Sequence, residues 1–160
     1  MSGVDKFIKV STNNLKPAKG RLLLSEPFMG DYYFGRSVVL LAEHNEEGSF
    51  GLVLNKPFDQ PFNDVVKDFP EFNGPLFVGG PVETDSLFYV HTKGDIIEGS
   101  LEIGNGLYWG GDIEIIKELL LINKITPSEI RFSVGYSGWS PDQLQEELNR
   151  NSWLVSKNRS

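Results

Sequence analysis

The chain has 160 residues, of which 39% are hydrophobic and 12% aromatic, a composition that predicts one globular domain with a sizeable core. Its formal net charge is −7, and its 15 Lys and Arg residues are spread along the sequence, which disfavours binding to nucleic-acid phosphates or to anionic membranes. Cysteine is absent, so disulfides, thiol nucleophiles and cysteine-ligated zinc are excluded. Because no segment reads as a signal peptide or a membrane span, we expect a cytoplasmic protein.

The first half of the chain predicts an arm followed by a buried hairpin. Residues 1–19 are mostly polar, and we expect an N-terminal arm that forms a short docking helix or packs on another subunit. Residues 21–25 predict a short strand. Residues 37–43 are a continuous apolar run that predicts a central strand buried on both faces, and residues 50–54 predict its antiparallel partner.

The second half alternates short strands with helices. Helices are predicted at residues 63–69, at 113–123 with Asp112 as the N-cap, as one turn at 126–129, and from 140 to about 150. Strands are predicted at residues 76–78, 87–91, 96–103, 107–109 (as an edge strand) and 131–134, and residues 151–155 are expected to end the core. This pattern predicts a single mixed α+β domain over residues 20–156, followed by a loose tail at 157–160.

Four blocks of sequence carry a recognisable pattern: GRLLLSEPFMGD (20–31) with FGRSVVLL (34–41), EHNEEGSFGLVLNKP (43–57), GGPV (79–82) leading into LFYVH (87–91), and GYSGWSPDQLQEEL (135–148) with NSWL (151–154). In this order they resemble the YqgE/AlgH family of bacterial proteins over roughly residues 20–155. The resemblance implies a bifurcated, strongly bent, mostly antiparallel sheet with packed helices and extended loops. It implies no established biochemical activity, although some members are named as transcriptional regulators.

Polar residues gather at the ends of the two predicted hairpin strands, where side chains emerge from a core. The candidate ligand-binding residues are Asp31, Arg36, His44, Asn55, Gly79 and Gly80. For Asp31 and Arg36, one interpretation is a charge pair that anchors the loop before the strand. The other is that Arg36 binds an anionic ligand beside Asn55.

The histidines and the glycine pair also have two interpretations each. His44 and His91 each end an apolar strand, where a ring can donate to a loop carbonyl and rest on the core. An acid/base or metal role would require nearby carboxylates, and no metal-binding spacing is present. Gly79 and Gly80 predict a tight turn, since the phosphate-loop motifs that would make them an anion cradle are missing.

The sequence assigns no catalytic residue, no metal ligand and no cofactor. The segment Gly135–Trp139 falls short of a nucleophile elbow because its second glycine comes one position too early. We instead expect Trp139 and Trp153 to be core residues.

Two classes of function stay open. The favoured one is a non-enzymatic protein that binds an unknown protein partner or small ligand, with a possible role in regulation. The alternative is a small-molecule enzyme or ligand sensor with a site near Arg36, Asn55 and His44.

The acidic charge generates a first prediction. The purified protein should not bind duplex DNA with micromolar affinity at physiological salt, because it lacks the run of cations that replaces phosphate counterions. A gel-shift titration at two salt concentrations checks this. A salt-dependent shift at micromolar protein would contradict it.

Overall fold

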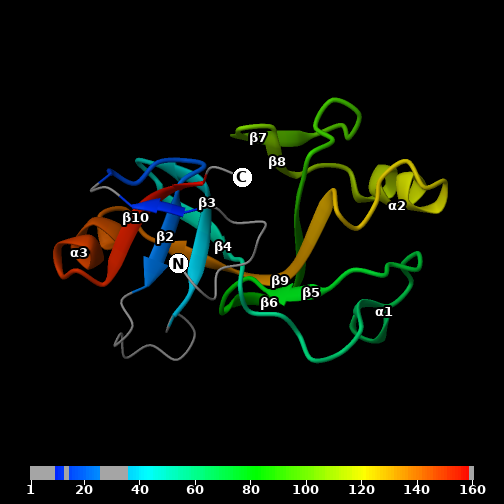
Figure 1. Ribbon diagram of the computed structural model, residues 1–160, viewed down its shortest axis with the longest axis horizontal. Helices are drawn as coiled ribbons and strands as arrows, with labels where there is room; N and C mark the ends of the chain where they lie inside the picture. Colours follow the sequence, from blue (N-terminus) through cyan, green and yellow to red (C-terminus); the bar gives the residue numbers. More distant parts are fainter. Residues whose placement is uncertain (1–9, 13–14, 26–35, 159–160) are drawn as a thin grey trace.

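The computed structural model describes residues 10–12, 15–25 and 36–158. Within them the elements are β1 (Val10–Thr12), β2 (Leu22–Ser25), β3 (Val38–Asn45), β4 (Gly48–Val53), α1 (Phe62–Val65), β5 (Leu76–Val78), β6 (Val82–His91), β7 (Ser100–Gly104), β8 (Leu107–Gly110), α2 (Ile113–Leu121), β9 (Ile130–Trp139), α3 (Gln143–Asn149) and β10 (Trp153–Asn158). The strands form a curled sheet in the order β1-β10-β2-β3-β4-β9-β6-β8-β7, and β5 pairs with β9 outside this path (Figure 1).

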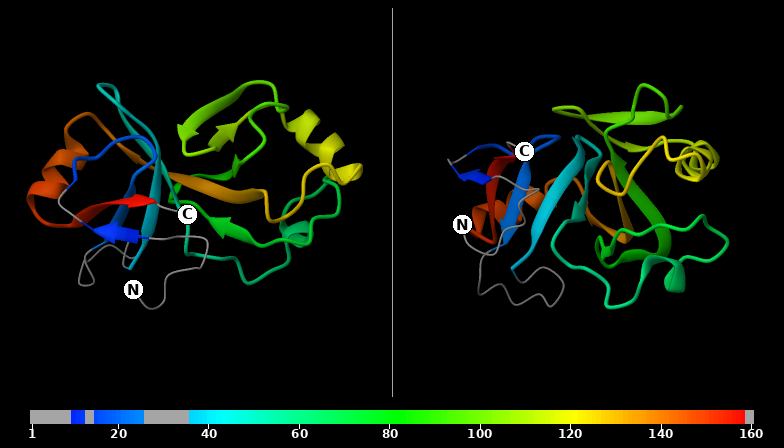
Figure 2. Two further views of the ribbon diagram at one scale, coloured as in Figure 1. Left: turned by 45° about the horizontal axis from the view of Figure 1, so that its top comes forward. Right: turned by 45° about the vertical axis from the view of Figure 1, so that its right-hand side comes forward.

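The sheet forks on β9. Residues 130–134 and Tyr136 of this strand pair with β6, and residues 132–134 also pair with β5, whereas residues 137–139 pair with β4. Gly135 lies where the partner changes, with a φ of +74°, and a Cβ there would stand 2.3 Å from the Gly80 carbonyl oxygen. Glycine alone permits this conformation and approach without strain. The bifurcated, bent and mostly antiparallel sheet that the family resemblance implies is therefore confirmed (Figure 2).

Three apolar clusters fill the two halves of the molecule. Alternate residues of β2 and β3 face opposite clusters, because side chains alternate along a strand. Leu22 and Leu40 point into the cluster enclosed by the curled sheet, and Leu23 and Val39 into the cluster under α3. The third cluster lies between β5, β6 and β9 on one side and the helices α1 and α2 on the other. The predicted burial of the 37–43 strand on both faces is confirmed for residues 38–42.

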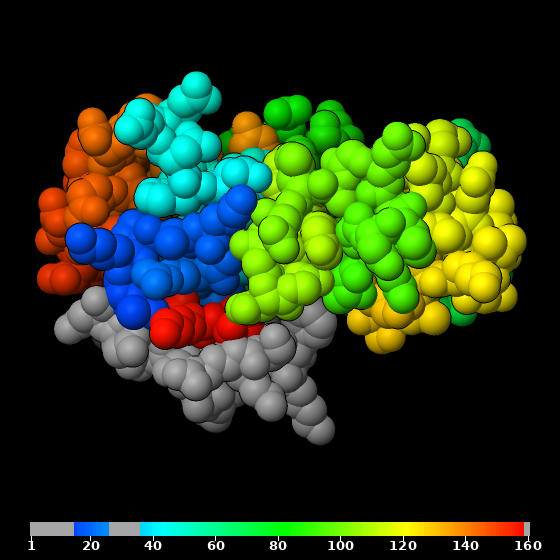
Figure 3. Space-filling view, turned by 90° about the horizontal axis from the view of Figure 1, so that it is seen from above, coloured from blue at the N-terminus to red at the C-terminus, as the bar shows by residue number. Residues whose placement is uncertain are grey.

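The β7–β8 hairpin folds back over the curled sheet. Ile103 at its tip joins the enclosed cluster. Trp109 stacks on Phe50 with ring centroids 4.7 Å apart, and its indole Nε1 donates to Glu43 Oε2 over 3.0 Å. In Figure 3, seen from above, this hairpin and the β2 segment lie side by side. The hairpin thus brings the far end of the sheet next to β2 and β10.

Several predicted elements differ from the structure, each for a local reason. α1 ends at Val65 instead of residue 69, because the Asn63 side chain accepts from the Phe72 amide and donates to the carbonyls of Phe69 and Pro70, which holds a loop. Residues 126–129 form a turn: Glu129 Oε1 accepts from the Thr126 amide, and the chain enters β9 directly.

The remaining differences concern strand positions. Only residues 100–104 of the predicted 96–103 strand are extended, and Ile97 enters the core from a turn. β8 is not an edge strand, since β7 lies outside it. Two residues of the predicted loose tail, Lys157 and Asn158, belong to β10, where they pair with β1 from the predicted arm.

A shared carboxylate holds the C-terminal tryptophans. Glu147 Oε1 accepts from the indole nitrogens of Trp139 (3.0 Å) and Trp153 (2.8 Å), and Glu147 Oε2 accepts from the side-chain Nε2 of Gln143 (3.1 Å). The two indoles meet edge to face at 5.8 Å, and each is 5% exposed. The predicted burial of both tryptophans is confirmed. This arrangement fastens α3 to β9 and β10.

Trp139→Ala should lower the free energy of unfolding by about 3–5 kcal/mol, since it empties a large buried site and leaves a Glu147 hydrogen bond unmade. Leu154→Ala on β10 is the control, and it should cost far less because Leu154 is 40% exposed. Urea denaturation of both variants measures the difference. Equal stability of Trp139→Ala and the wild type would rule out the packing role.

Candidate functional site

Asn55 follows β4, and its side-chain amide binds backbone groups next to the start of β3. Its Oδ1 accepts from the Val38 amide and its Nδ2 donates to the Arg36 carbonyl, both over 2.9 Å. Arg36 has a left-handed φ of +57°, and the Asn55 amide holds it in that conformation. The Arg36 side chain is exposed. Asp31 lies outside the described residues, so the predicted Asp31–Arg36 pair stays a prediction.

The structure does not bring His44 to Arg36 and Asn55. His44 is at the far end of β3, where its Nδ1 lies 2.7 Å from Ser49 Oγ. The six steps from Val38 to His44 span roughly 20 Å in an extended strand. One small ligand cannot contact both ends, so the predicted grouping of these three side chains is not formed.

Gly79 and Gly80 are buried against β9. The Gly79 amide donates to Val134, and its carbonyl accepts from the Val53 amide and from Ser137 Oγ. A Cβ on Gly80 would stand 2.2 Å from the Tyr136 backbone. Because the Gly79 amide is already bonded, the pair serves close backbone contact, and neither residue belongs to an assigned turn.

A hollow of about 170 Å³ lies inside the curled sheet, between its two halves. Its walls are largely apolar and are formed by the buried Leu40, Leu54, Phe77, Val90 and Ile130 and by the half-buried Leu107. Its mouth is formed by the exposed residues Pro75, Thr92, Pro127 and Ser128. We call this the inner hollow. A preformed apolar hollow with a few polar groups at its edge is typical of a small-molecule site.

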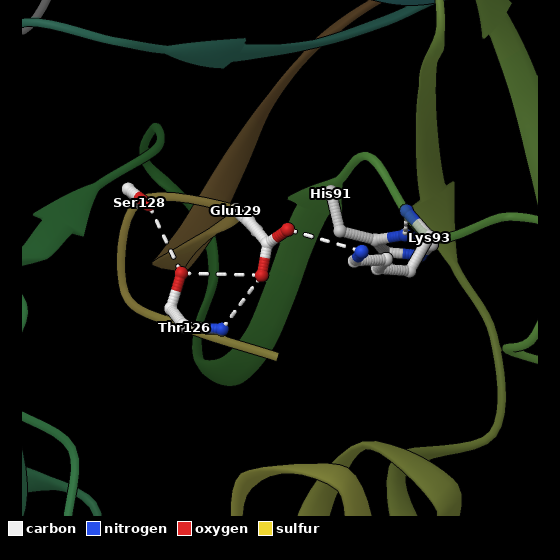
Figure 4. A network of polar contacts seen from close by, with 5 residues as sticks. All are labelled: His91, Lys93, Thr126, Ser128 and Glu129. Atoms are coloured by element: carbon white, nitrogen blue, oxygen red, sulfur yellow. Dashed lines mark hydrogen bonds and ion pairs between the residues drawn. The ribbon is translucent and has the colours of Figure 1, made fainter. Parts of the chain in front are cut away.

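Two charged residues at the edge of the inner hollow, Arg131 and Glu129, are bonded to neighbouring groups. Arg131 lies 4.1 Å from the centre of the Phe77 ring, and its Nη1 donates to the Leu54 carbonyl over 2.6 Å. Glu129 forms an ion pair with Lys93 at 3.0 Å, and hydrogen bonds from Lys93 and the Thr126 amide hold the pKa of Glu129 below its ordinary value. Figure 4 shows the network that joins Lys93, Glu129 and Thr126 beside His91.

His91 is the titratable residue buried deepest in this wall, with 1% of its surface exposed. Its Nε2 lies 2.9 Å from the Gly110 carbonyl and 3.2 Å from Ser100 Oγ, and its Nδ1 accepts from the Lys93 amide over 3.1 Å. These partners select the neutral tautomer with the proton on Nε2. Burial lowers the pKa of His91, although the bond to Gly110 opposes this effect. The sequence interpretation of a ring that donates to a loop carbonyl describes His91 correctly.

Sequence reasoning missed most of the inner hollow. Leu107, Ser128, Arg131 and the Asn158 side chain come from separate segments, and each looks like an ordinary strand or turn residue in its own surroundings. His91 at the end of an apolar run was the one available signal. In the described part of the chain, no three His, Asp or Glu side chains gather as metal ligands. None of the described helices has the length and apolar character that a membrane span requires.

His91 makes stability depend on pH. The pKa of His91 is lower in the folded state, so the unfolded chain binds the proton more readily. The contribution of His91 to the free energy of unfolding is therefore complete above pH 6.5 and falls as the pH drops below this value. The slope is limited to about 1.4 kcal/mol per pH unit for one proton. Urea denaturation at pH 7.5, 6.5 and 5.5 tests this against His91→Gln. The stability advantage of the wild type over this variant should shrink toward pH 5.5, and a constant advantage would contradict the assignment.

Comparisons with known proteins agree with this fold. The sequence profile described as AlgH-like matches residues 22–160. A UPF0301 protein of Bacteroides fragilis is 48% identical over 152 residues, covering 94% of this chain and 77% of that protein; one from Parabacteroides distasonis is 44% identical over 158 residues, covering 98% and 80%. The solution structure of the AlgH protein from Pseudomonas aeruginosa superimposes with a TM-score of 0.71 at 31% identity, covering 87% of this chain and 76% of that protein. A crystal structure of a Corynebacterium diphtheriae protein gives a TM-score of 0.75 at 26% identity, covering 91% of this chain and 78% of that one. The chain therefore belongs to the AlgH-like family.

Proposed function

We propose that the protein is a non-enzymatic, cytoplasmic binding protein whose inner hollow takes a small, mainly apolar ligand. The single observation that carries this proposal is the hollow itself: Leu40 and Leu54 on its walls are each 2% exposed, and most of its lining is apolar, with His91 and Asn158 as its buried polar residues. Its volume of about 170 Å³ is close to that of an apolar protein cavity that holds a benzene-sized molecule, about 150 Å³.

The chemistry of the walls favours a ligand with a ring or a branched aliphatic body. Apolar walls gain from the removal of apolar surface from water, while a buried polar group without a partner is costly. Polar ligand atoms would therefore lie at the mouth, where the Thr92 and Ser128 hydroxyls are exposed. The charges of Glu129 and Arg131 are held by Lys93 and Leu54, which keeps the centre of the hollow apolar.

Geometry does not favour catalysis at His91. Both ring nitrogens are bonded to the protein, and Ser128 Oγ lies 3.0 Å from Thr126 Oγ1 as part of a turn. A general base must reach the proton that it abstracts. As a base, His91 would first have to lose its hydrogen bond from the Lys93 amide.

Because a net charge of −7 disfavours contact with DNA phosphates, a regulatory role would act through the bound ligand and not through direct contact with DNA.

Benzyl alcohol, a ring with one hydroxyl, is a suitable probe. In a titration followed by amide NMR shifts it should bind saturably with a Kd of roughly 1 mM, as expected for eight heavy atoms. The shifts should centre on residues 90, 107 and 130. Leu107→Trp fills the hollow and should abolish the effect. Leu101→Trp is the control, because Leu101 belongs to the same hairpin but is 49% exposed and outside the lining.

A second variant keeps the test valid if Leu107→Trp does not fold. Leu54→Ala enlarges the hollow, so 2-naphthol should bind this variant more tightly than it binds the wild type. Unsaturable shifts spread over the surface, or equal loss of binding in Leu101→Trp and Leu107→Trp, would overturn the proposal.

A further inference from the structure

A second hollow lies at the seam where the tip of the β7–β8 hairpin meets β2 and β10. It is wide and open, with a volume of about 730 Å³. Three cationic residues line it, Lys19, Arg21 and Lys157, together with the amide of Asn105. No carboxylate belongs to the described residues that form this lining. We call it the basic seam. The cations that the sequence scatters are thus gathered here by the fold.

Two of these cations lie at the end of the β2–β10 pairing. The register ends with Ser156 opposite Leu22, and Lys157 and Arg21 are the next residues along the two segments. Like charges that line the same hollow repel each other. A chain whose formal net charge is −7 offers many carboxylates, yet the described ion pairs are Lys93–Glu129 and Lys117–Glu114, both elsewhere.

Backbone contacts hold Gly20 in place at the basic seam, and with it the main chain of the two neighbouring cationic residues. The Gly20 amide donates to the Leu41 carbonyl over 2.8 Å, and a Cβ on Gly20 would stand 3.1 Å from the Ile103 carbonyl oxygen. Lys19 and Arg21 flank this contact. Arg21 Nη1 donates to the Lys16 carbonyl over 2.6 Å, which uses one of the five guanidinium N–H groups.

We propose that the basic seam binds a compact multivalent anion, such as a diphosphate group or a polycarboxylate. An anion between Lys19, Arg21 and Lys157 would relieve their mutual repulsion and accept charge-assisted hydrogen bonds. Three cations suit one or two phosphate groups, far fewer than the contacts that duplex DNA requires. The site is independent of the inner hollow, with which it shares only Asn158.

Inorganic pyrophosphate is the first probe, titrated into the purified full chain at low salt and followed by calorimetry and amide NMR shifts. Binding should be saturable, centred on residues 19–21, 104–105 and 157, and weakened by added salt. Lys19→Gln and Lys157→Gln should each weaken it about tenfold. Lys124→Gln is the matched control, since Lys124 is an exposed lysine outside the lining.

Thermal unfolding gives a readout that does not depend on the titration. Pyrophosphate should raise the Tm of the wild type more than that of Lys157→Gln. Without anion at low salt, Lys157→Gln should have the higher Tm, because one of the three positive charges that line the basic seam is removed.

Two further ligands separate the sources of the anion. Citrate that binds as well as pyrophosphate supports a site for multivalent anions in general, and preference for pyrophosphate supports a phosphate site. A 20-base-pair duplex that binds far more tightly than both would overturn the small-anion proposal. So would the absence of saturable binding, or an equal loss of affinity in Lys124→Gln.

Discussion

The close crossing of two backbones at Gly80 and Gly135 is the constraint on which the rest of the structure depends. A Cβ on Gly79 would lie 2.4 Å from the Gly135 carbonyl oxygen, and one on Gly135 would lie 2.3 Å from the Gly80 carbonyl oxygen. Real side chains do not tolerate such contacts, so any other residue would force the segments apart. At this crossing β9 exchanges β6 and β5 for β4. The bend of the sheet is therefore set by three residues without side chains.

The bend explains why a hollow exists inside a well-packed protein. A flat sheet would let Leu40 and Leu54 on one half pack directly against a covering helix. Here the two halves turn toward each other, and Val90 and Ile130 face them across a gap that the side chains do not fill. Arg131 then spans the gap from β9 to the Leu54 carbonyl. The guanidinium group is hydrogen-bonded at the edge of the hollow, so its charge does not stand in the apolar interior.

Elements with strong local signals could be predicted from the sequence, and elements held by distant partners could not. The apolar run of β3, the hairpin with β4 and the buried Trp139 and Trp153 follow from hydrophobic pattern and residue size. α1 ends early because the Asn63 side chain binds the backbone of the following loop, a contact that no periodicity reveals. The same holds for the two hollows. Lys157 reaches the basic seam only through the register of β10 with β2.

The residues that make the family recognisable are mostly those that build the fold. In the last block of resemblance, Gly135 permits the bend, Ser137 Oγ donates to the Gly79 carbonyl, and Trp139 donates to Glu147. Only part of the inner hollow comes from these blocks. The wall residues Leu40, Leu54 and Val90 lie within them, whereas Phe77, Leu107 and Ile130 and the mouth at residues 75, 92 and 127–128 lie outside. Substitutions of Leu40, Leu54 and Val90 act on the fold and the hollow together. Substitutions at the mouth change what can enter while the Gly80–Gly135 crossing, and with it the bent sheet, stays in place.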